Sequence, residues 1–319
     1  MAIEVISIGS SSSGNSYIIM AGSRTILLDV GLTAKRILGA LEHFDIDPET
    51  IDAVLITHEH TDHSKSVRAI SRKCPNAVFY ASRGTIAGTG NFIYVPEERV
   101  KVVKAGDSFV VRPAGRDSED AAGGSAQPDV IVSVFPLSHD AREPVGFTVR
   151  CGRDKLAAVT DTGTVTEEIF RAAADANKLI FESNHDEHLL MFGEYPYMLK
   201  QRIKSDHGHL SNDYAGAVLA RLLSHYYESI HPQTGIYEGR LSDEYIDLED
   251  DLAEESAAEA AEGAGSDAVS IMLAHLSEHN NLPLYAGQAV EAALKESGFI
   301  RGKHYKLCIA AKETLTVMK

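Results

Sequence analysis

The sequence of 319 residues predicts an α+β domain built on two β-sheets, with helices on their outer faces. Three observations predict this fold class. Strand-like and helix-like segments alternate in the first third of the chain, strand-like segments dominate the middle, and helix-like segments return towards the C-terminus. We therefore expect a single domain over residues 1–319, interrupted by two insertions.

The first third begins with three short strand-like segments and continues with helix and strand in turn. A serine-rich loop separates the first two strands, and Thr33 is a plausible N-cap for the first helix. The short apolar run before residue 57 is expected to be a buried strand. The expected strands are Glu4–Ile8, Tyr17–Met20, Thr25–Leu28 and Ala53–Ile56, and the expected helices are Thr33–His43 and Ser64–Lys73.

The middle of the chain carries six strand-like segments, and helices return after them. The expected strands are Val78–Tyr80, Val100–Val103, Phe109–Arg112, Val130–Phe135, Gly146–Arg150 and Leu156–Val159. The later elements are expected to be helices at Val165–Ala176, Asn212–Tyr226 and Leu282–Ser297, with strands at Leu179–Phe181, Val269–Leu273, Tyr305–Ala310 and Thr314–Val317.

Two segments have a composition that a packed core does not use. Residues 113–128 are rich in Gly, Ala, Ser and charge, so we expect a flexible loop. Residues 229–265 are acidic, rich in Ala and Gly, and poor in large apolar side chains. We expect them to form a largely mobile insertion, with a transient helix near Leu252–Glu262.

The formal net charge of −16 is concentrated in this acidic segment. Residues 228–267 hold 13 acids and one arginine, and the rest of the chain carries 33 acids against 29 bases. Because the body is nearly balanced, the total charge does not exclude a phosphate-rich substrate.

Membrane and secretion signals are not expected from this sequence. No segment approaches the roughly 18–20 apolar residues that a membrane-spanning helix needs, and residues 1–4 do not begin a signal peptide. Cys74, Cys151 and Cys308 are far apart in apolar surroundings, which is typical of buried thiols in a reducing compartment. We expect a cytoplasmic protein.

Residues 57–63, which read Thr-His-Glu-His-Thr-Asp-His, carry four potential metal ligands directly after a strand: His58, His60, Asp62 and His63. A single histidine here would be best explained as a polar loop residue. In an extended segment, however, His58 and His60 point the same way, while Asp62 and His63 lie where a helix begins. This arrangement suits two metal ions about 3.5–4 Å apart.

Three further candidates follow predicted strands elsewhere in the chain. His139, Asp161 and His275 each come within a few residues of the end of an apolar segment. Any one of them alone would be explained as a loop residue. Together with the cluster at 58–63, they predict that ligands from several strand ends converge at one sheet edge.

These residues resemble the ligand pattern of the metallo-β-lactamase superfamily. The resemblance implies a four-layer αββα sandwich with the metal site at one edge of the two sheets. It also implies that His58, His60 and His139 hold a first metal ion, that Asp62, His63 and His275 hold a second, and that Asp161 bridges them. Asp29 would lie behind the ligands and fix the loop that carries them.

Four further segments resemble the YycJ/WalJ-like branch of this superfamily, whose members are described as exonuclease-like. These segments are Gly9–Ser16, Ser138–Ala141, Glu182–Asp186 and Gly208–Asn212. The layout is also similar to that of tRNase Z, a phosphodiesterase in which a Glu and a His outside the metal ligands assist proton transfer. Glu182 and His209 match these two positions, although His209 could also be a residue at the start of a helix.

The sequence thus favours a dinuclear metal-dependent hydrolase that uses a metal-bridging hydroxide. With Asp161, His209 and Glu182 as catalytic residues, we expect a phosphodiesterase or nuclease acting on DNA or RNA. A small-molecule hydrolase, such as a thioesterase or lactonase, remains an alternative on the same fold. A metal-binding regulatory protein without catalysis is a third interpretation.

The expected cofactor is a pair of divalent metal ions. Five imidazoles and two carboxylates suit Zn(II), and Mn(II) or Fe(II) fit the same ligand types. The expected partner is a nucleic acid substrate. The serine-rich loop could bind a phosphate through its backbone N–H groups, or it could be a plain hairpin turn. The candidate substrate-binding residues are Ser13, Asn15, Asn184 and His185.

Overall fold

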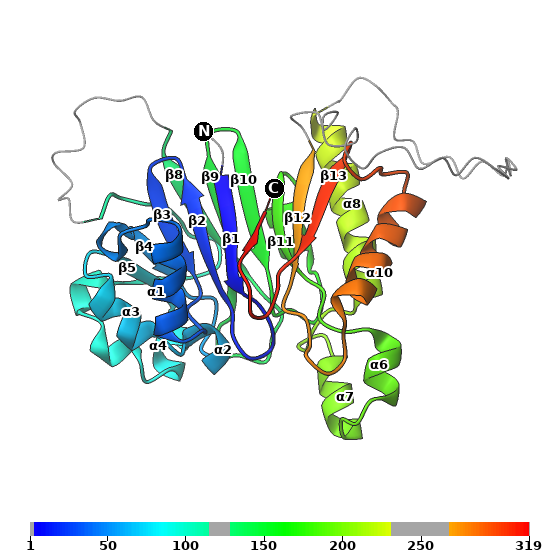
Figure 1. Cartoon of the computed structure of the whole chain (residues 1–319), viewed down its shortest axis with the longest axis horizontal. Coiled ribbons are helices and arrows are strands. Elements are labelled where there is room, and N and C mark those ends of the chain that lie inside the picture. Colours follow the sequence, from blue (N-terminus) through cyan, green and yellow to red (C-terminus); the bar gives the residue numbers. More distant parts are fainter. Residues whose placement is uncertain (1–2, 115–127, 231–267, 319) are drawn as a thin grey trace, which may run out of the picture.

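The computed structural model describes residues 3–114, 128–230 and 268–318, and in these ranges it contains two seven-stranded sheets. The sheets face each other, and helices cover their outer faces, as Figure 1 shows. The predicted αββα sandwich is therefore confirmed. Most of the predicted insertion at 113–128, and residues 231–265 of the acidic one, lie outside the described residues, as does the helix expected near 252–262.

The first sheet has the strand order β14-β1-β2-β3-β4-β5-β6. Its first four strands in this order pair antiparallel, and β3 to β6 pair parallel. The strands are β1 (Ile3–Gly9), β2 (Ser16–Ala21), β3 (Arg24–Leu28), β4 (Ala53–Leu55), β5 (Val78–Ser82), β6 (Val100–Val103) and β14 (Thr316–Val317).

The second sheet has the order β13-β12-β11-β10-β9-β8-β7. Strands β7 to β10 pair antiparallel, and β10 to β13 pair parallel. The strands are β7 (Ser108–Val110), β8 (Val130–Pro136), β9 (Val145–Cys151), β10 (Asp154–Val159), β11 (Lys178–Glu182), β12 (Val269–Ala274) and β13 (Tyr305–Ile309).

Three apolar clusters hold the layers together. One fills the space between the sheets, and the other two lie under the helices on each outer face. The helices α1 (Ala34–His43) and α3 (Val67–Lys73) pack on the first sheet, while α5 (Glu167–Ala173), α8 (Asn212–Ile230) and α10 (Pro283–Glu296) pack on the second. The chain therefore places its candidate ligands at the rim of the sandwich and not in its apolar interior.

The parallel strands of both sheets bring polar residues to one edge. Asp29 follows β3 and His58 follows β4 in the first sheet, while Asp161 follows β10 and His275 follows β12 in the second. Because parallel strands end on the same side, the predicted convergence of ligands is the direct consequence of this topology.

Some elements differ from the prediction. The helix expected over Ser64–Lys73 is two helices, α2 (Thr61–Ser64) and α3, with a break at Ser66. There, the backbone N–H of Ser66 donates to Val30 O, and its hydroxyl donates to Leu32 O. Because the N–H of Ser66 bonds to a residue outside the helix, the helix is not continuous at this position. At the other end of the domain, α8 continues to Ile230, two residues into the segment that we predicted to be an insertion.

Further helices were not predicted: α4 (Arg83–Gly88), α6 (Glu187–Phe192) and α7 (Tyr197–Ile203), besides three short 3₁₀ turns. In the described ranges, no helix combines the length and apolarity that crossing a bilayer requires. All three cysteines are free thiols.

Candidate metal centre

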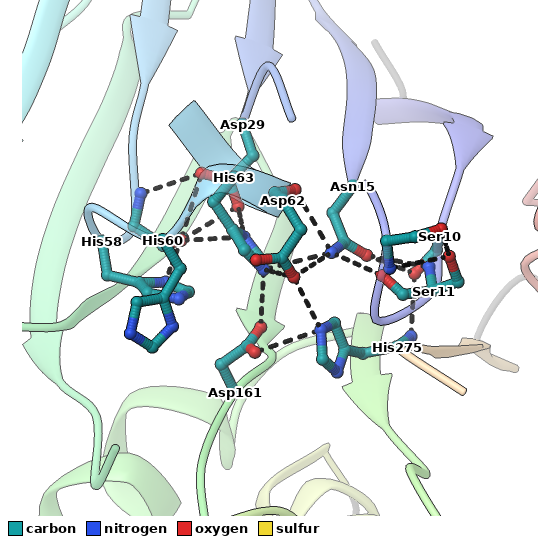
Figure 2. Close-up of polar contacts among 12 residues, drawn as sticks. Ser10, Ser11, Asn15, Asp29, His58, His60, Asp62, His63, Asp161 and His275 are labelled. Carbon is teal, nitrogen blue, oxygen red and sulfur yellow. Dashed lines mark hydrogen bonds and ion pairs between the residues drawn. The ribbon is translucent and has the colours of Figure 1, made fainter. Parts of the chain in front are cut away.

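Seven side chains that could ligate metal meet at the edge where the parallel strands end, and Figure 2 labels all of them except His139. They form two groups, within each of which the possible ligand atoms lie within 4.8 Å of one another. We call His58, His60 and His139 the imidazole group. We call Asp62, His63, Asp161 and His275 the mixed group.

The imidazole group keeps its ring nitrogens free on one side. His58 Nδ1 lies 3.0 Å from Thr57 Oγ1, and its buried Nε2 has no hydrogen-bond partner among the described residues. His139 Nδ1 donates to Gly208 O at 3.2 Å, and its Nε2 lies 3.3 Å from His60 Nδ1. Both rings thus donate a hydrogen bond from Nδ1–H to a neighbouring protein oxygen and direct Nε2 towards the site. Metal-binding histidines are usually oriented in this way.

The mixed group joins ligands from both sheets at short distances. His63 Nε2 lies 3.2 Å from Asp62 Oδ2 and 3.1 Å from Asp161 Oδ2. His275 Nε2 lies 3.4 Å from Asp62 Oδ2 and 3.1 Å from Asp161 Oδ1. Each imidazole therefore faces two carboxylates, as the dashed lines in Figure 2 show for several of these contacts.

Asp161 lies between the two groups. Its Oδ2 faces His63, while its Oδ1 faces His275 and lies 3.9 Å from His139 Nε2 in the imidazole group. The carboxylate is buried, with 2% of the residue exposed. Its two oxygens are thus available to two neighbouring cations.

The residues present fit divalent metal ions. His63 Nδ1 donates a hydrogen bond to Asp29 Oδ2 at 2.7 Å. In the neutral imidazole, Nε2 then carries a lone pair, and it faces Asp161 Oδ2, which has no hydrogen-bond donor among the described residues. Two buried lone pairs this close together need a cation or a proton between them.

The pKa values show where protons collect when no metal is bound. Burial alone would lower the pKa of His275, but Asp161, Asp62 and Glu182 outweigh it and raise the pKa to about 10. For His63, burial also acts to lower the pKa, and its neighbouring carboxylates raise it well above the usual value. These two imidazoles carry the positive charge that a metal ion would otherwise supply.

Two histidines of the imidazole group, His58 and His139, behave in the opposite way. Burial, together with the neighbouring charge of His63, lowers the pKa of His58 well below its ordinary value. Burial is also the main cause that lowers the pKa of His139, against the carboxylate of Asp161. Both rings are therefore neutral at pH 7 and ready to ligate.

Three residues of the site have a left-handed backbone. The φ angles are 55° for Asp29, 57° for Asp161 and 55° for His275, and each residue follows a strand of the central sheets. Non-glycine residues rarely adopt this conformation, and it costs free energy where it occurs. It turns each side chain out of the strand direction and into the site.

Asp29 is hydrogen-bonded to the loop that carries the candidate ligands. Its Oδ1 accepts hydrogen bonds from Thr57 N at 2.9 Å and Thr57 Oγ1 at 3.1 Å, while its Oδ2 binds His63 Nδ1. Thr57 in turn contacts His58. A single buried carboxylate thereby orients one ring from each group.

Glu182 and His209 lie beside the mixed group. His209 Nδ1 is 2.7 Å from Glu182 Oε1, and its ring stacks on His275 with centroids 5.2 Å apart. Glu182 also binds His275 Nδ1 at 3.3 Å and accepts Thr162 N at 2.9 Å. Burial alone would raise the pKa of Glu182, but His209 and His275 lower it, so the carboxylate stays ionised.

The four candidate substrate-binding residues differ in position. Ser13 is exposed, and its hydroxyl donates to Glu278 Oε1 at 2.5 Å. Asn15 is buried against Asp62 and His63. Asn184 is also buried and donates to His275 O at 2.8 Å, and His185 is buried with an Nδ1 that has no partner among the described residues. Three of the four are thus buried, and two of these, Asn15 and Asn184, contact candidate ligands.

The hairpin of α6 and α7 borders the site and was missed in the sequence. At its inner end, Arg202 Nε binds Asp140 Oδ2 at 2.5 Å, and the backbone N–H of His209 donates to Ile203 O. Figure 1 shows the two helices projecting from the body of the protein. The N-cap Asp186, whose side chain accepts from Leu189 N, was a signal in the sequence that could have located α6.

Comparison with known proteins identifies relatives for both the sequence and the fold. A family model described as a beta-lactamase superfamily domain matches residues 24–231. The exodeoxyribonuclease YycJ of Bacillus anthracis is 28% identical over 308 residues, which cover 96% of this chain and 95% of that protein. The exodeoxyribonuclease WalJ of Streptococcus pneumoniae is 31% identical over 224 residues, covering 70% of this chain and 78% of that protein.

Solved structures share the fold at low sequence identity. The metallo-beta-lactamase fold protein YhfI of Bacillus subtilis superposes with a TM-score of 0.59 at 12% identity, covering 99% of this chain and 100% of that one. The short form of human tRNase Z has a TM-score of 0.52 at 13% identity, with 98% of each chain covered. At these identities the likeness describes the fold alone.

Proposed function

This chain belongs to the beta-lactamase superfamily, and on that premise we propose that it is a metal-dependent exonuclease that hydrolyses phosphodiester bonds in DNA. The observation that carries the proposal is the contact of 2.7 Å between His209 Nδ1 and Glu182 Oε1, beside two groups of potential metal ligands. Its relatives named exodeoxyribonucleases, one of which matches almost the whole chain, support DNA as the substrate.

In this proposal, the imidazole group would hold one divalent ion, Asp62, His63 and His275 would hold a second, and Asp161 would serve both. When bound, such a pair of ions supplies Lewis acidity and a hydroxide nucleophile at neutral pH. Zn(II) suits the five imidazoles and two carboxylates, and Mn(II) or Fe(II) share these ligand preferences.

The role of His209 follows from its contacts. Glu182 is buried and ionised, and its Oε1 accepts a hydrogen bond from Nδ1–H of His209 at 2.7 Å. The other nitrogen, Nε2, is then an acid for the oxygen that leaves when the phosphodiester bond breaks. His209 is therefore the proton donor of the reaction, and Glu182 positions it and balances its charge.

The test combines a substrate panel with one substitution. The purified protein is loaded with Zn(II) or Mn(II) and offered end-labelled single- and double-stranded DNA and RNA, together with bis-p-nitrophenyl phosphate and a thioester. We expect DNA to be shortened from one end. A protein that consumed the thioester and left nucleic acid intact would instead be a small-molecule hydrolase.

The variant His209→Ala separates the role of the acid from metal binding. We expect DNA cleavage to fall by about 10²–10⁴-fold, since general acid catalysis contributes that much. Cleavage of bis-p-nitrophenyl phosphate should fall far less, because p-nitrophenolate leaves without a proton. The exposed residue His43, on α1, gives the matched control His43→Ala. Unchanged DNA cleavage by His209→Ala with full metal content would contradict the role.

A further inference from the structure

A chain of buried hydrogen bonds links the loop between β1 and β2 to ligands from both sheets. Ser10 Oγ accepts from Tyr17 Oη and from His275 N, both at 2.8 Å, and it donates to Asn15 Oδ1 at 2.9 Å. Burial raises the pKa of the Tyr17 hydroxyl, so it remains a donor. Because a serine hydroxyl has a single hydrogen, these two donors direct that hydrogen to Asn15.

The orientation of the Asn15 amide is therefore determined. Its Oδ1 accepts from Ser10 Oγ and from Ser11 N, the latter at 3.2 Å. The Nδ2 group must then point the other way, where one of its hydrogens goes to Ser11 O at 2.9 Å. The second hydrogen faces the mixed group, as Figure 2 shows, with His63 Nε2 at 3.1 Å and Asp62 Oδ2 at 3.4 Å.

Of these two neighbours, only Asp62 can accept this hydrogen when the site is functional. A metal ion bound at His63 Nε2 would occupy the lone pair of that nitrogen, which could then accept no hydrogen bond from Asn15. Asp62 then remains as the acceptor, through Oδ2 at 3.4 Å and through its backbone oxygen at 3.5 Å. The backbone of Asn15 binds the same residue, because its N–H donates to Asp62 O at 2.8 Å.

We propose that Asn15 is a positioning residue which holds the Asp62 carboxylate in its ligating orientation, and so sets the affinity of the mixed group for a divalent cation. Asp62 needs this support, since its side chain is 21% exposed whereas the side chain of His63 is fully buried. Ser10 also links the two sheets, because its hydroxyl oxygen accepts a hydrogen bond from the backbone N–H of His275. The inference rests on the proposed metal site.

The effect should be confined to one half of the centre. In the described parts of the chain, the hydrogen bonds of Asn15 and Ser10 reach Asp62, His63 and His275, and they do not reach the imidazole group. A substitution at Asn15 should therefore weaken one ion and spare the other. A defect of general folding would weaken both.

The test is calorimetric titration of metal-free protein with Zn(II), with bound metal counted by elemental analysis. We expect the unsubstituted protein to bind two ions per chain. Asn15→Ala should bind one ion as before and the second about 10–100-fold more weakly, which is the usual effect of residues that orient metal ligands. Asn76→Ala is the matched control, since Asn76 also donates through its amide to a backbone oxygen, Glu49 O, away from the site.

A second variant keeps the test valid if Asn15→Ala does not fold, which thermal unfolding of the metal-free protein would reveal. Ser10→Ala removes the hydrogen that fixes the amide but retains Asn15, so it should weaken the same ion by a smaller factor. Two unchanged affinities, or an equal loss of both, would overturn the inference.

The same titration distinguishes this inference from the proposed function. If the unsubstituted protein binds two ions and does not cleave DNA, the proposed function fails, and the role of Asn15 is still decided by the variants. If it cleaves DNA and Asn15→Ala binds both ions normally, only the inference fails. If it binds no ion, both fail.

Discussion

The imidazole group and the mixed group share one edge of the sandwich, but they hold their histidines in opposite electrical surroundings. His58 and His139 are buried among other imidazoles, and their pKa values are lowered. His63 and His275 face carboxylates, and their pKa values are raised. The comparison teaches that His58 and His139 are ready to ligate at pH 7, whereas His63 and His275 must exchange protons for a metal ion.

The largest effect is expected where the two groups meet. Asp161→Asn removes the carboxylate that lies between them but keeps the shape of the side chain, and asparagine tolerates the left-handed backbone at this position. We expect DNA cleavage to fall on the order of 10³-fold, as when a preorganised charge is lost from an active site. Metal titration should show that the mixed group is weakened more than the imidazole group.

The control for this variant is Asp213→Asn, at an exposed position in the first turn of α8. Cleavage by Asp161→Asn within tenfold of the unsubstituted protein would mean that the carboxylate does not serve both groups.

A smaller effect concerns the stability of the metal-free protein at different pH values. The pKa of His275 rises from an ordinary value near 6.5 to about 10 on folding. Its contribution to stability is therefore complete below about pH 6.5 and is lost as the pH rises towards 10. We expect the unfolding temperature of metal-free protein to fall between pH 7 and 9, relative to metal-loaded protein.

This difference should become smaller in His275→Gln, in which the pKa of His63 is still raised, and persist in full in His43→Ala. Parallel curves for the metal-free and metal-loaded protein over this pH range would show that protons and metal do not compete in the mixed group.

The smallest effect is expected from the charge next to the imidazole group. Arg202 binds Asp140, which is adjacent to His139, but the arginine side chain is 58% exposed. Because exposed ion pairs contribute about 0–1 kcal/mol, Arg202→Gln should change DNA cleavage by less than about fivefold. The more exposed pair of Arg171 and Glu167 on α5 supplies the control Arg171→Gln. A loss of DNA cleavage above tenfold in Arg202→Gln would show that the imidazole group also depends on the ion pair between Arg202 and Asp140.

The convergence of the candidate ligands could be predicted because its signals are local in the sequence. His58 to His63 follow a short apolar strand, and Asp161 and His275 follow others, so the strand ends alone brought them to one edge. The break in the helix at Ser66 could not be predicted, since it depends on bonds to Val30 and Leu32 more than thirty residues away.

The helices α6 and α7 lack the signal that reveals amphipathic helices. Leu190 is the one fully buried residue of α6, and α7 has none, so neither shows a periodic apolar stripe. Asn15 illustrates the reverse difficulty. The composition of its loop, which is rich in serine with glycine and asparagine, predicts solvent exposure. The burial of this loop depends on polar partners that lie far from one another in the sequence.

The left-handed backbone at Asp29, Asp161 and His275 has a consequence for how this protein can change over time. Glycine would relieve the backbone strain at each position. A single substitution to glycine would therefore favour folding, but it would remove a side chain that serves the site. Selection for stability alone would therefore replace these three side chains, and selection for activity is needed to retain them. Asparagine, which tolerates the same conformation, is the residue through which Asp29 and Asp161 can vary with the least disturbance of the backbone.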